Sequence, residues 1–157
     1  MSQTVYASQP DKGVPGTLVT EANAIKRTYV AASTLTPGRY AGIDSAGKAA
    51  HLTAAPTAAT RGGFVIRNMY KDNDGVIAAG EPCELLEAGN MWVTVESTCA
   101  QNGAVFIRHT AGAGGSGIGA ARLDADTATA ASIPGLYFRE ALAATGVANV
   151  EINQSAA

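Results

Sequence analysis

The sequence is poor in charge, poor in aromatic residues and without long apolar runs. Charged residues make up 15% of the 157 residues, against about 25% in a typical soluble domain. The formal net charge of −2 gives no general attraction to nucleic acid. No segment approaches the ~20 apolar residues of a membrane helix, and the N-terminus has no basic start followed by an apolar run. We therefore expect no nucleic-acid partner, no membrane partner and no secretory signal.

Cysteine and histidine, which most often bind metals or act in catalysis, occur only twice each. Cys83 and Cys99 belong to no C-x-x-C motif or Cys/His cluster, so metal binding is not expected. Both should remain thiols unless the strand register brings their Cα atoms within ~7 Å. His51 and His109 have no nucleophile elbow or other catalytic signature nearby. We expect no catalytic residue, no metal and no cofactor.

Two motifs resemble ligand-binding loops but lack the required context. Gly112-x-Gly114-x-x-Gly117 has the glycine spacing of a dinucleotide-binding loop, yet no amphipathic helix follows to hold a pyrophosphate. The run Asp72–Gly75 resembles a calcium loop, but its glycine is fourth instead of sixth. A hairpin turn explains this run better, with a weak calcium contact as the alternative.

Three short strands separated by two tight turns form the most regular part of the chain. The strands are rich in Val, Leu, Ile, Trp and Phe, and both turns contain Asn and Gly, which accept positive φ. We expect a β-meander here. The expected strands are Glu81–Glu87, Met91–Glu96 and Ala104–Arg108, and the turns are Ala88–Asn90 and Gln101–Gly103.

The remaining patterns indicate more short strands and no long helix. Strands are expected at Ala24–Ala32, Arg39–Ile43, Lys48–Leu52, Gly63–Asn68, Leu136–Arg139 and Val147–Ile152. The fold class predicted is all-β, a small barrel or two-layer sandwich of roughly eight to ten short strands. We divide the chain into an extended N-terminal arm, residues 1–23, and a β domain, residues 24–157.

The N-terminal arm has no hydrophobic periodicity but contains apolar residues whose side chains must be buried against some surface. It either wraps on its own barrel, reaches another subunit, or is a frayed terminus. Trp92 alternates with Met91 and Val93, so we expect its side chain to face outward, as in an interface. The candidate partner contacts are Val5, Tyr6, Val14, Leu18 and Trp92.

The surface composition also bears on partners. Of the apolar residues, 32 are alanines, so a surface lean in charge is rich in small residues. Either neighbouring subunits cover much of it, or the composition reflects lineage bias. From Asp72 to Glu96 there are six acidic residues and no Lys or Arg. This stretch either steers a basic partner or simply solvates the outer face of the meander, and the second explanation is favoured.

The order of motifs resembles the tailed-bacteriophage structural cement, or capsid decoration, family. The motifs are PGTLV, TPGRYAGID, GGFVIRN, AAGEPCELLEAGNMWVTVE with NGAVFIR, and IPGLYF followed by GVANVEI. The resemblance covers most of residues 14–152. It implies a β-rich protein without catalytic residues that binds the outer surface of the capsid and bridges neighbouring major capsid subunits. Such a protein is made in the host cytoplasm and resides on the virion.

The resemblance further implies partners of two kinds, the major capsid protein and other copies of the chain. For the homo-oligomer we expect a trimer rather than a dimer, although closed symmetry permits both. The alternative function is a receptor- or carbohydrate-binding β-module of a phage particle, but the five tyrosines are scattered. A hydrolase on a β scaffold is a third alternative, and the missing catalytic constellation argues against it.

Overall fold

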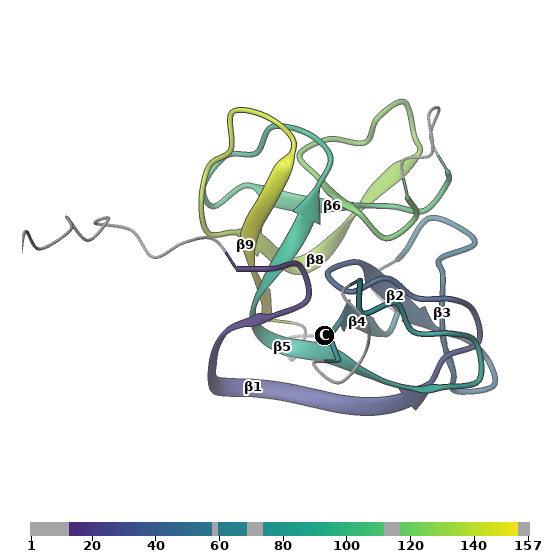
Figure 1. Cartoon of the computed structure of the whole chain (residues 1–157). Coiled ribbons are helices and arrows are strands. Elements are labelled where there is room, and N and C mark those ends of the chain that lie inside the picture. The colour runs from purple at the N-terminus through teal and green to yellow at the C-terminus, as the bar shows by residue number, and fades with distance from the viewer. Residues whose placement is uncertain (1–12, 58–59, 69–73, 112–116, 154–157) are drawn as a thin grey trace, which may run out of the picture.

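The computed structural model describes residues 13–57, 60–68, 74–111 and 117–153, which form nine β-strands and no helix (Figure 1). The strands are β1 (Leu18–Val30), β2 (Tyr40–Ile43), β3 (Ala49–Ala50), β4 (Gly62–Val65), β5 (Pro82–Val95), β6 (Ala104–Arg108), β7 (Ala121–Arg122), β8 (Ala130–Phe138) and β9 (Gly146–Asn153). The prediction of an all-β fold is confirmed.

The strands form one sheet that closes on itself in its C-terminal part. The sheet order is β3-β2-β4-β5-β7-β6-β8-β9, and β9 also pairs with β5. This second pairing closes β5, β7, β6, β8 and β9 into a small barrel. Figure 1 shows β6, β8 and β9 at one end of the molecule and β2, β3 and β4 at the other, with β5 passing between them. Of the two predicted architectures, the barrel is the one observed.

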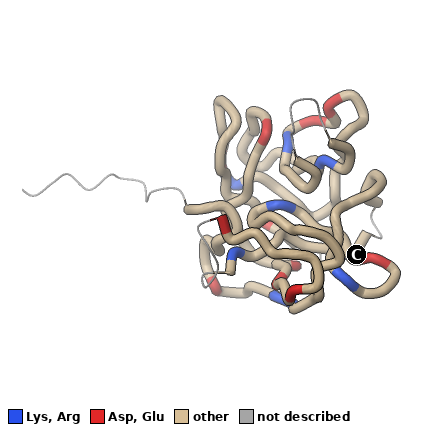
Figure 2. Tube along the Cα trace, turned by 45° about the vertical axis from the view of Figure 1, so that its right-hand side comes forward, with Lys and Arg blue, Asp and Glu red and all other residues tan. Residues whose placement is uncertain are grey.

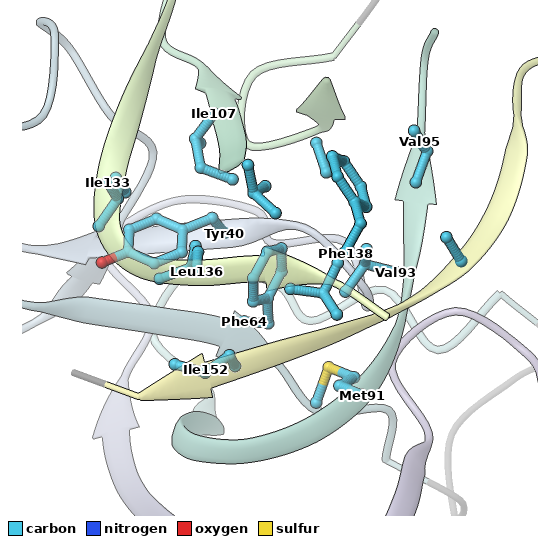
Figure 3. Packing of buried hydrophobic residues seen from close by; sticks show 14 of the residues in the cluster. Tyr40, Phe64, Met91, Val93, Val95, Ile107, Ile133, Leu136, Phe138 and Ile152 are labelled. Atoms are coloured by element: carbon cyan, nitrogen blue, oxygen red, sulfur yellow. The ribbon is translucent and has the colours of Figure 1, made fainter. Parts of the chain in front are cut away.

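Two apolar clusters pack against this sheet. The larger lies inside the barrel and joins residues from the strands of both ends, among them Tyr40, Phe64 and Phe138 (Figure 3). The Tyr40 and Phe64 rings meet edge to face, with centroids 5.5 Å apart. The smaller cluster includes Leu35 and Leu85 and lies on the other side of the open sheet. The strand β5 contributes side chains to both clusters and therefore connects the two cores.

The first predicted hairpin is wrong, because Glu81–Glu87 and Met91–Glu96 do not fold back on each other. Pro82–Val95 is one continuous strand of 14 residues. Within the predicted turn only Gly89 has positive φ, at 122°, whereas a two-residue type I′ turn needs two such residues. The first half of β5 instead pairs with β1 and β4, and its second half pairs with β9 and, at Asn90 and Met91, also with β1.

The predicted meander is also wrong in its last step, although its turn exists. Asn102 has φ of 63° and Gly103 N donates to Ala100 O, so the chain does turn there. However, β6 pairs with β7 and β8 and not with β5. The short strand β7 pairs in parallel with β5 at Val95 and Ala121, and so separates β5 from β6. No strand was predicted at β7, since two residues carry no periodicity.

Other elements match the sequence pattern closely. The predicted hairpin between Arg39 and Leu52 is present as β2 and β3, and the Asp44 carboxylate accepts hydrogen bonds from Ala46 N and Lys48 N in its turn. The last strand, β9, also agrees with prediction. Two strands are longer than expected: β8 begins at Ala130, and β1 begins at Leu18. The strand β1 therefore crosses residue 23, and the division of the chain at that residue stays a prediction.

The central packing makes a quantitative prediction for Phe64, whose side chain is fully buried beside Tyr40. Phe64→Ala should lower the free energy of unfolding by about 3–5 kcal/mol, because it removes buried apolar surface and leaves a cavity. Val76→Ala, at a residue 37% exposed, is the control and should change it by less than about 0.5 kcal/mol. Chemical denaturation of both variants measures the difference. Equal, small effects would contradict the observed core.

Candidate partner-binding surface

A tight turn shapes the first described residues, Gly13–Thr17, which we call the arm root. Thr17 donates to Val14 O through both its backbone N (3.0 Å) and its hydroxyl (2.7 Å). Pro15 and Gly16 occupy the central positions, and Gly16 has φ of 87°. Proline followed by a glycine of positive φ is the sequence requirement of a type II turn. The sequence VPGT therefore reverses the chain locally just before β1.

The arm root is attached to the barrel through the backbone of β5. Gly16 N donates to Trp92 O at 2.8 Å, and Trp92 N donates to Thr17 O at 3.0 Å. On its other side, Gly16 O accepts from Arg67 N at 2.8 Å, and the Arg67 Nε donates to Pro15 O at 3.2 Å. These bonds satisfy backbone groups that would otherwise lie unpaired at the edge of β5. The arm therefore leaves the domain from a fixed point.

Two Pro-Gly turns pack against each other at this point and make glycine necessary in both. A Cβ added to Gly16 would lie 2.6 Å from the Pro37 Cβ, and one added to Gly38 would lie 2.6 Å from the Pro15 Cβ. Both glycines also have positive φ. The sequence motifs PGTLV and TPGRYAGID, distant in the chain, thus form one contact.

Trp92 lies on the outer side of β5, between the buried residues Met91 and Val93, and its side chain is half-buried. The arm root covers it: a Cβ on Gly13 would be 2.1 Å from the indole Cδ1. The arm root therefore crosses directly over the indole ring, and only a glycine permits that distance.

The other predicted contact residues differ in their accessibility. Val14 is 52% exposed, beside Trp92 in the arm root. Leu18 instead packs against the larger core cluster, so much of its side chain is already in contact. Val5 and Tyr6 lie outside the described residues. The structure thus places Val14 next to Gly13, which lies against Trp92, and a partner role for any of the five stays a prediction.

The acidic stretch does not form one solvated face in the part that the structure describes. Glu87 accepts a hydrogen bond from the Tyr29 hydroxyl at 2.5 Å and pairs with Arg27 at 3.0 Å. Glu96 pairs with Arg108 at 2.7 Å. Only Glu84 among these three is exposed. Figure 2 shows charged residues scattered along the trace and separated by long uncharged stretches.

A buried arginine organises a charge cluster that the sequence patterns did not indicate. Arg108 is 2% exposed; its Nε donates to Glu96 at 2.7 Å and its Nη2 to Asp126 at 2.6 Å. Its Nη1 also donates to the Thr129 hydroxyl, and Glu96 accepts from Gly117 N. The cluster ties the segment following Gly117 to the barrel wall. The available signal was an Arg and a Glu ending two adjacent predicted strands.

These contacts change the ionisation of the cluster. Burial alone would lower the pKa of Arg108, but its hydrogen bonds to Glu96 and Asp126 outweigh that cost and raise the pKa. The hydrogen bond from Arg108, followed by that from Thr129, lowers the pKa of Asp126. Both groups are therefore held in their charged forms near neutral pH.

The candidate reactive residues are apart. Cys83 lies in the smaller cluster and Cys99 in the larger, and both are buried free thiols. Burial raises the pKa of Cys83, which makes its thiolate scarcer. His109 Nδ1 is 3.0 Å from the Thr110 hydroxyl. The first half of the Asp72–Gly75 run and most of the Gly112–Gly117 motif lie outside the described residues.

Among residues 13–57, 60–68, 74–111 and 117–153, no group of three or more His, Cys, Asp or Glu residues is arranged to hold a metal ion. Within the same ranges no helix has the length and apolar character needed to cross a membrane.

Comparison with known proteins finds a matching family and similar solved structures. The family model described as "Structural cement protein (E217 gp24/Pam3 gp6)" matches residues 1–153. A chain from "The capsid of Myoviridae Phage XM1" is similar over 97% of both chains, with a TM-score of 0.74 and 19% identity. A chain from "The crystal structure of head fiber gp8.5 N base in bacteriophage phi29" gives a TM-score of 0.45 at 14% identity, over 83% of this chain and 95% of that one. A search of curated proteins finds no match.

The contact between the two Pro-Gly turns can be tested with two glycine variants. Gly16→Ala and Gly47→Ala both place a Cβ at positive φ, 87° and 76°, but only at Gly16 is there an atom within 4 Å of it. Gly47→Ala should lower the free energy of unfolding by about 1 kcal/mol through backbone strain alone. Gly16→Ala should lower the free energy of unfolding by a further ~1–3 kcal/mol through the clash with Pro37. It should also shift the Trp92 fluorescence to longer wavelength. Equal costs and unchanged emission would argue against this contact.

The Arg108 cluster predicts a specific dependence of stability on pH. Because folding lowers the pKa of Asp126, its stabilising effect is present above the unfolded pKa and is lost as pH falls through the folded pKa. Asp126→Asn should be less stable than the unsubstituted protein at pH 7, and the gap should shrink below about pH 4. Urea denaturation at several pH values measures it. A gap that stays constant from pH 7 to pH 3 would contradict the assignment.

Proposed function

Because the chain belongs to the structural cement protein family, we propose that it binds the outer surface of a bacteriophage capsid and bridges neighbouring major capsid subunits. The family match over residues 1–153 is the observation that carries this proposal. The similarity of the whole fold to a chain of a phage capsid structure supports it. The protein is then made in the host cytoplasm and resides on the virion.

Such a protein stabilises the head through mass action. A ligand that binds only the assembled lattice stabilises that lattice by RT ln(1 + [L]/Kd), about 2.7 kcal/mol at a hundredfold excess over Kd. Contacts to several capsid subunits add affinity through effective concentration. We propose a symmetric homo-oligomer, a trimer in preference to a dimer, because it multiplies these contacts.

The arm root supports a role for the preceding twelve residues as a clamp. Four backbone and side-chain hydrogen bonds hold Gly16, Thr17 and Pro15 to Trp92 and Arg67. Because these hydrogen bonds hold the arm root to the barrel, a partner bound to the preceding residues is held to the barrel as well. In an extended form, twelve residues span up to ~40 Å, which is sufficient to reach a neighbouring subunit.

We propose that this function involves no catalysis. The two thiols are separated into different apolar clusters, and Cys83 has a raised pKa. Cys83 therefore lacks the lowered pKa of an activated nucleophile. The protein acts through binding alone.

Co-sedimentation with purified heads tests the proposal and the clamp separately. The full chain should bind heads, and a chain lacking residues 1–12 should fold normally but bind at least about tenfold more weakly, because one linked contact is lost. This deletion leaves the hydrogen bonds of Gly16 and Thr17 to Trp92 in place, so Trp92 fluorescence serves as its folding control.

A longer deletion, residues 1–16, also removes the bonds of Gly16 and should lower the stability. Full binding by the shorter deletion would reject the clamp and leave the cement function standing. Absence of binding by the full chain would reject the cement function itself.

A further inference from the structure

One side of the barrel wall presents a continuous outer surface across β5, β9 and β8. In the register of these strands Met91, Val150 and Phe138 form one row, and all three are buried in the core. Because side chains alternate along a strand, the rows on either side of it face outward. The outward residues are Asn90, Trp92, Tyr137, Arg139, Asn149 and Glu151, which we call the outer barrel face.

The outer barrel face has the composition of an interface core. Tyr137 is 44% exposed and is the one large aromatic residue so exposed among those that the structure describes. The two charged members, Glu151 and Arg139, pair with each other, so the face carries little net charge. Aromatic enrichment and depletion of charge at the centre are what distinguish interfaces from other surface.

The other exposed surfaces differ from this face. On β1 the exposed residues Val30 and Ile25 are interspersed with Lys26 and Arg27, and Asn23 has positive φ, so that strand is charged and irregular. Charges and irregularities of this kind discourage association at a sheet edge. The neutral outer barrel face has no such protection.

The arm root connects this face to the first twelve residues of the chain. Gly13 lies against the Trp92 indole, which belongs to the outer barrel face, and Val14 beside it is 52% exposed. The twelve preceding residues therefore start from this face and from no other. Any subunit held by those residues would be drawn toward Trp92 and, two strands away in the register, Tyr137.

We propose that the outer barrel face is the surface that seats on the assembled shell, with Tyr137 as an anchoring contact. This inference rests on the proposed cement function and adds which side of the protein carries it. The partner is a protein surface of low charge that offers apolar contacts to Tyr137. A second copy of the chain is the competing occupant.

A matched pair of charge insertions tests the proposal. Tyr137 and Val30 are 44% and 45% exposed, respectively, and both lie in strands. Tyr137→Lys should weaken co-sedimentation with purified heads at least about tenfold, because an anchor is lost and a charge is buried. Val30→Lys should bind within about twofold of the unsubstituted protein. Thermal unfolding confirms that each variant is folded, and Tyr137→Ser provides a second variant without added charge.

Each outcome has a definite meaning. Weak binding by Tyr137→Lys and Tyr137→Ser, with normal binding by Val30→Lys, supports the proposal. Equal binding by all three variants overturns it while the cement function stands. Loss of self-association by Tyr137→Lys, with head binding retained, overturns it in favour of a second copy; sedimentation equilibrium measures this. Failure of the unsubstituted protein to bind heads overturns the proposed function and this inference with it.

Discussion

The backbone pairing of β5 is the constraint on which the rest of the structure depends. Its 14 residues pass through both apolar clusters, and its peptide groups must find partners along the whole length, because buried N–H and C=O groups are costly when unpaired. The strands β1, β4, β7 and β9 supply most of them, and the arm root supplies others at Trp92. Gly89, with φ of 122°, lies near the point where pairing of β5 with β4 gives way to pairing with β9.

This arrangement connects the stability of the core to the geometry of binding. The arm root is hydrogen-bonded to the same strand that carries Met91 and Val93 into the core. The outer barrel face lies on the opposite side of the same strand. The proposed bridging role needs such rigidity, because flexible attachment would lower the effective concentration of linked contacts.

The chain has few charged residues, and several of those present pair with one another. Arg108, Glu96 and Asp126 bond to one another and tie the segment after Gly117 to the barrel. Arg139 and Glu151 form another pair. The Arg108 cluster organises the fold internally, whereas Arg139 and Glu151 pair on the outside. A surface of this kind suits many modest contacts better than one strongly charged site.

The sequence by itself determined the all-β class, the hairpin between Arg39 and Leu52, the turn at Asn102 and the last strand, because these depend on local propensity and on turns closed by neighbouring residues. It could not determine the partners of β5: Ala88–Asn90 has the composition of a hairpin turn, and only competition from β1, β4 and β9 keeps the strand continuous. The two-residue strand β7, the burial of Arg108 and the position of Gly13 on Trp92 likewise exist only in the folded chain. Each joins residues far apart in sequence, and no local pattern encodes which distant group will satisfy a given backbone amide or charge.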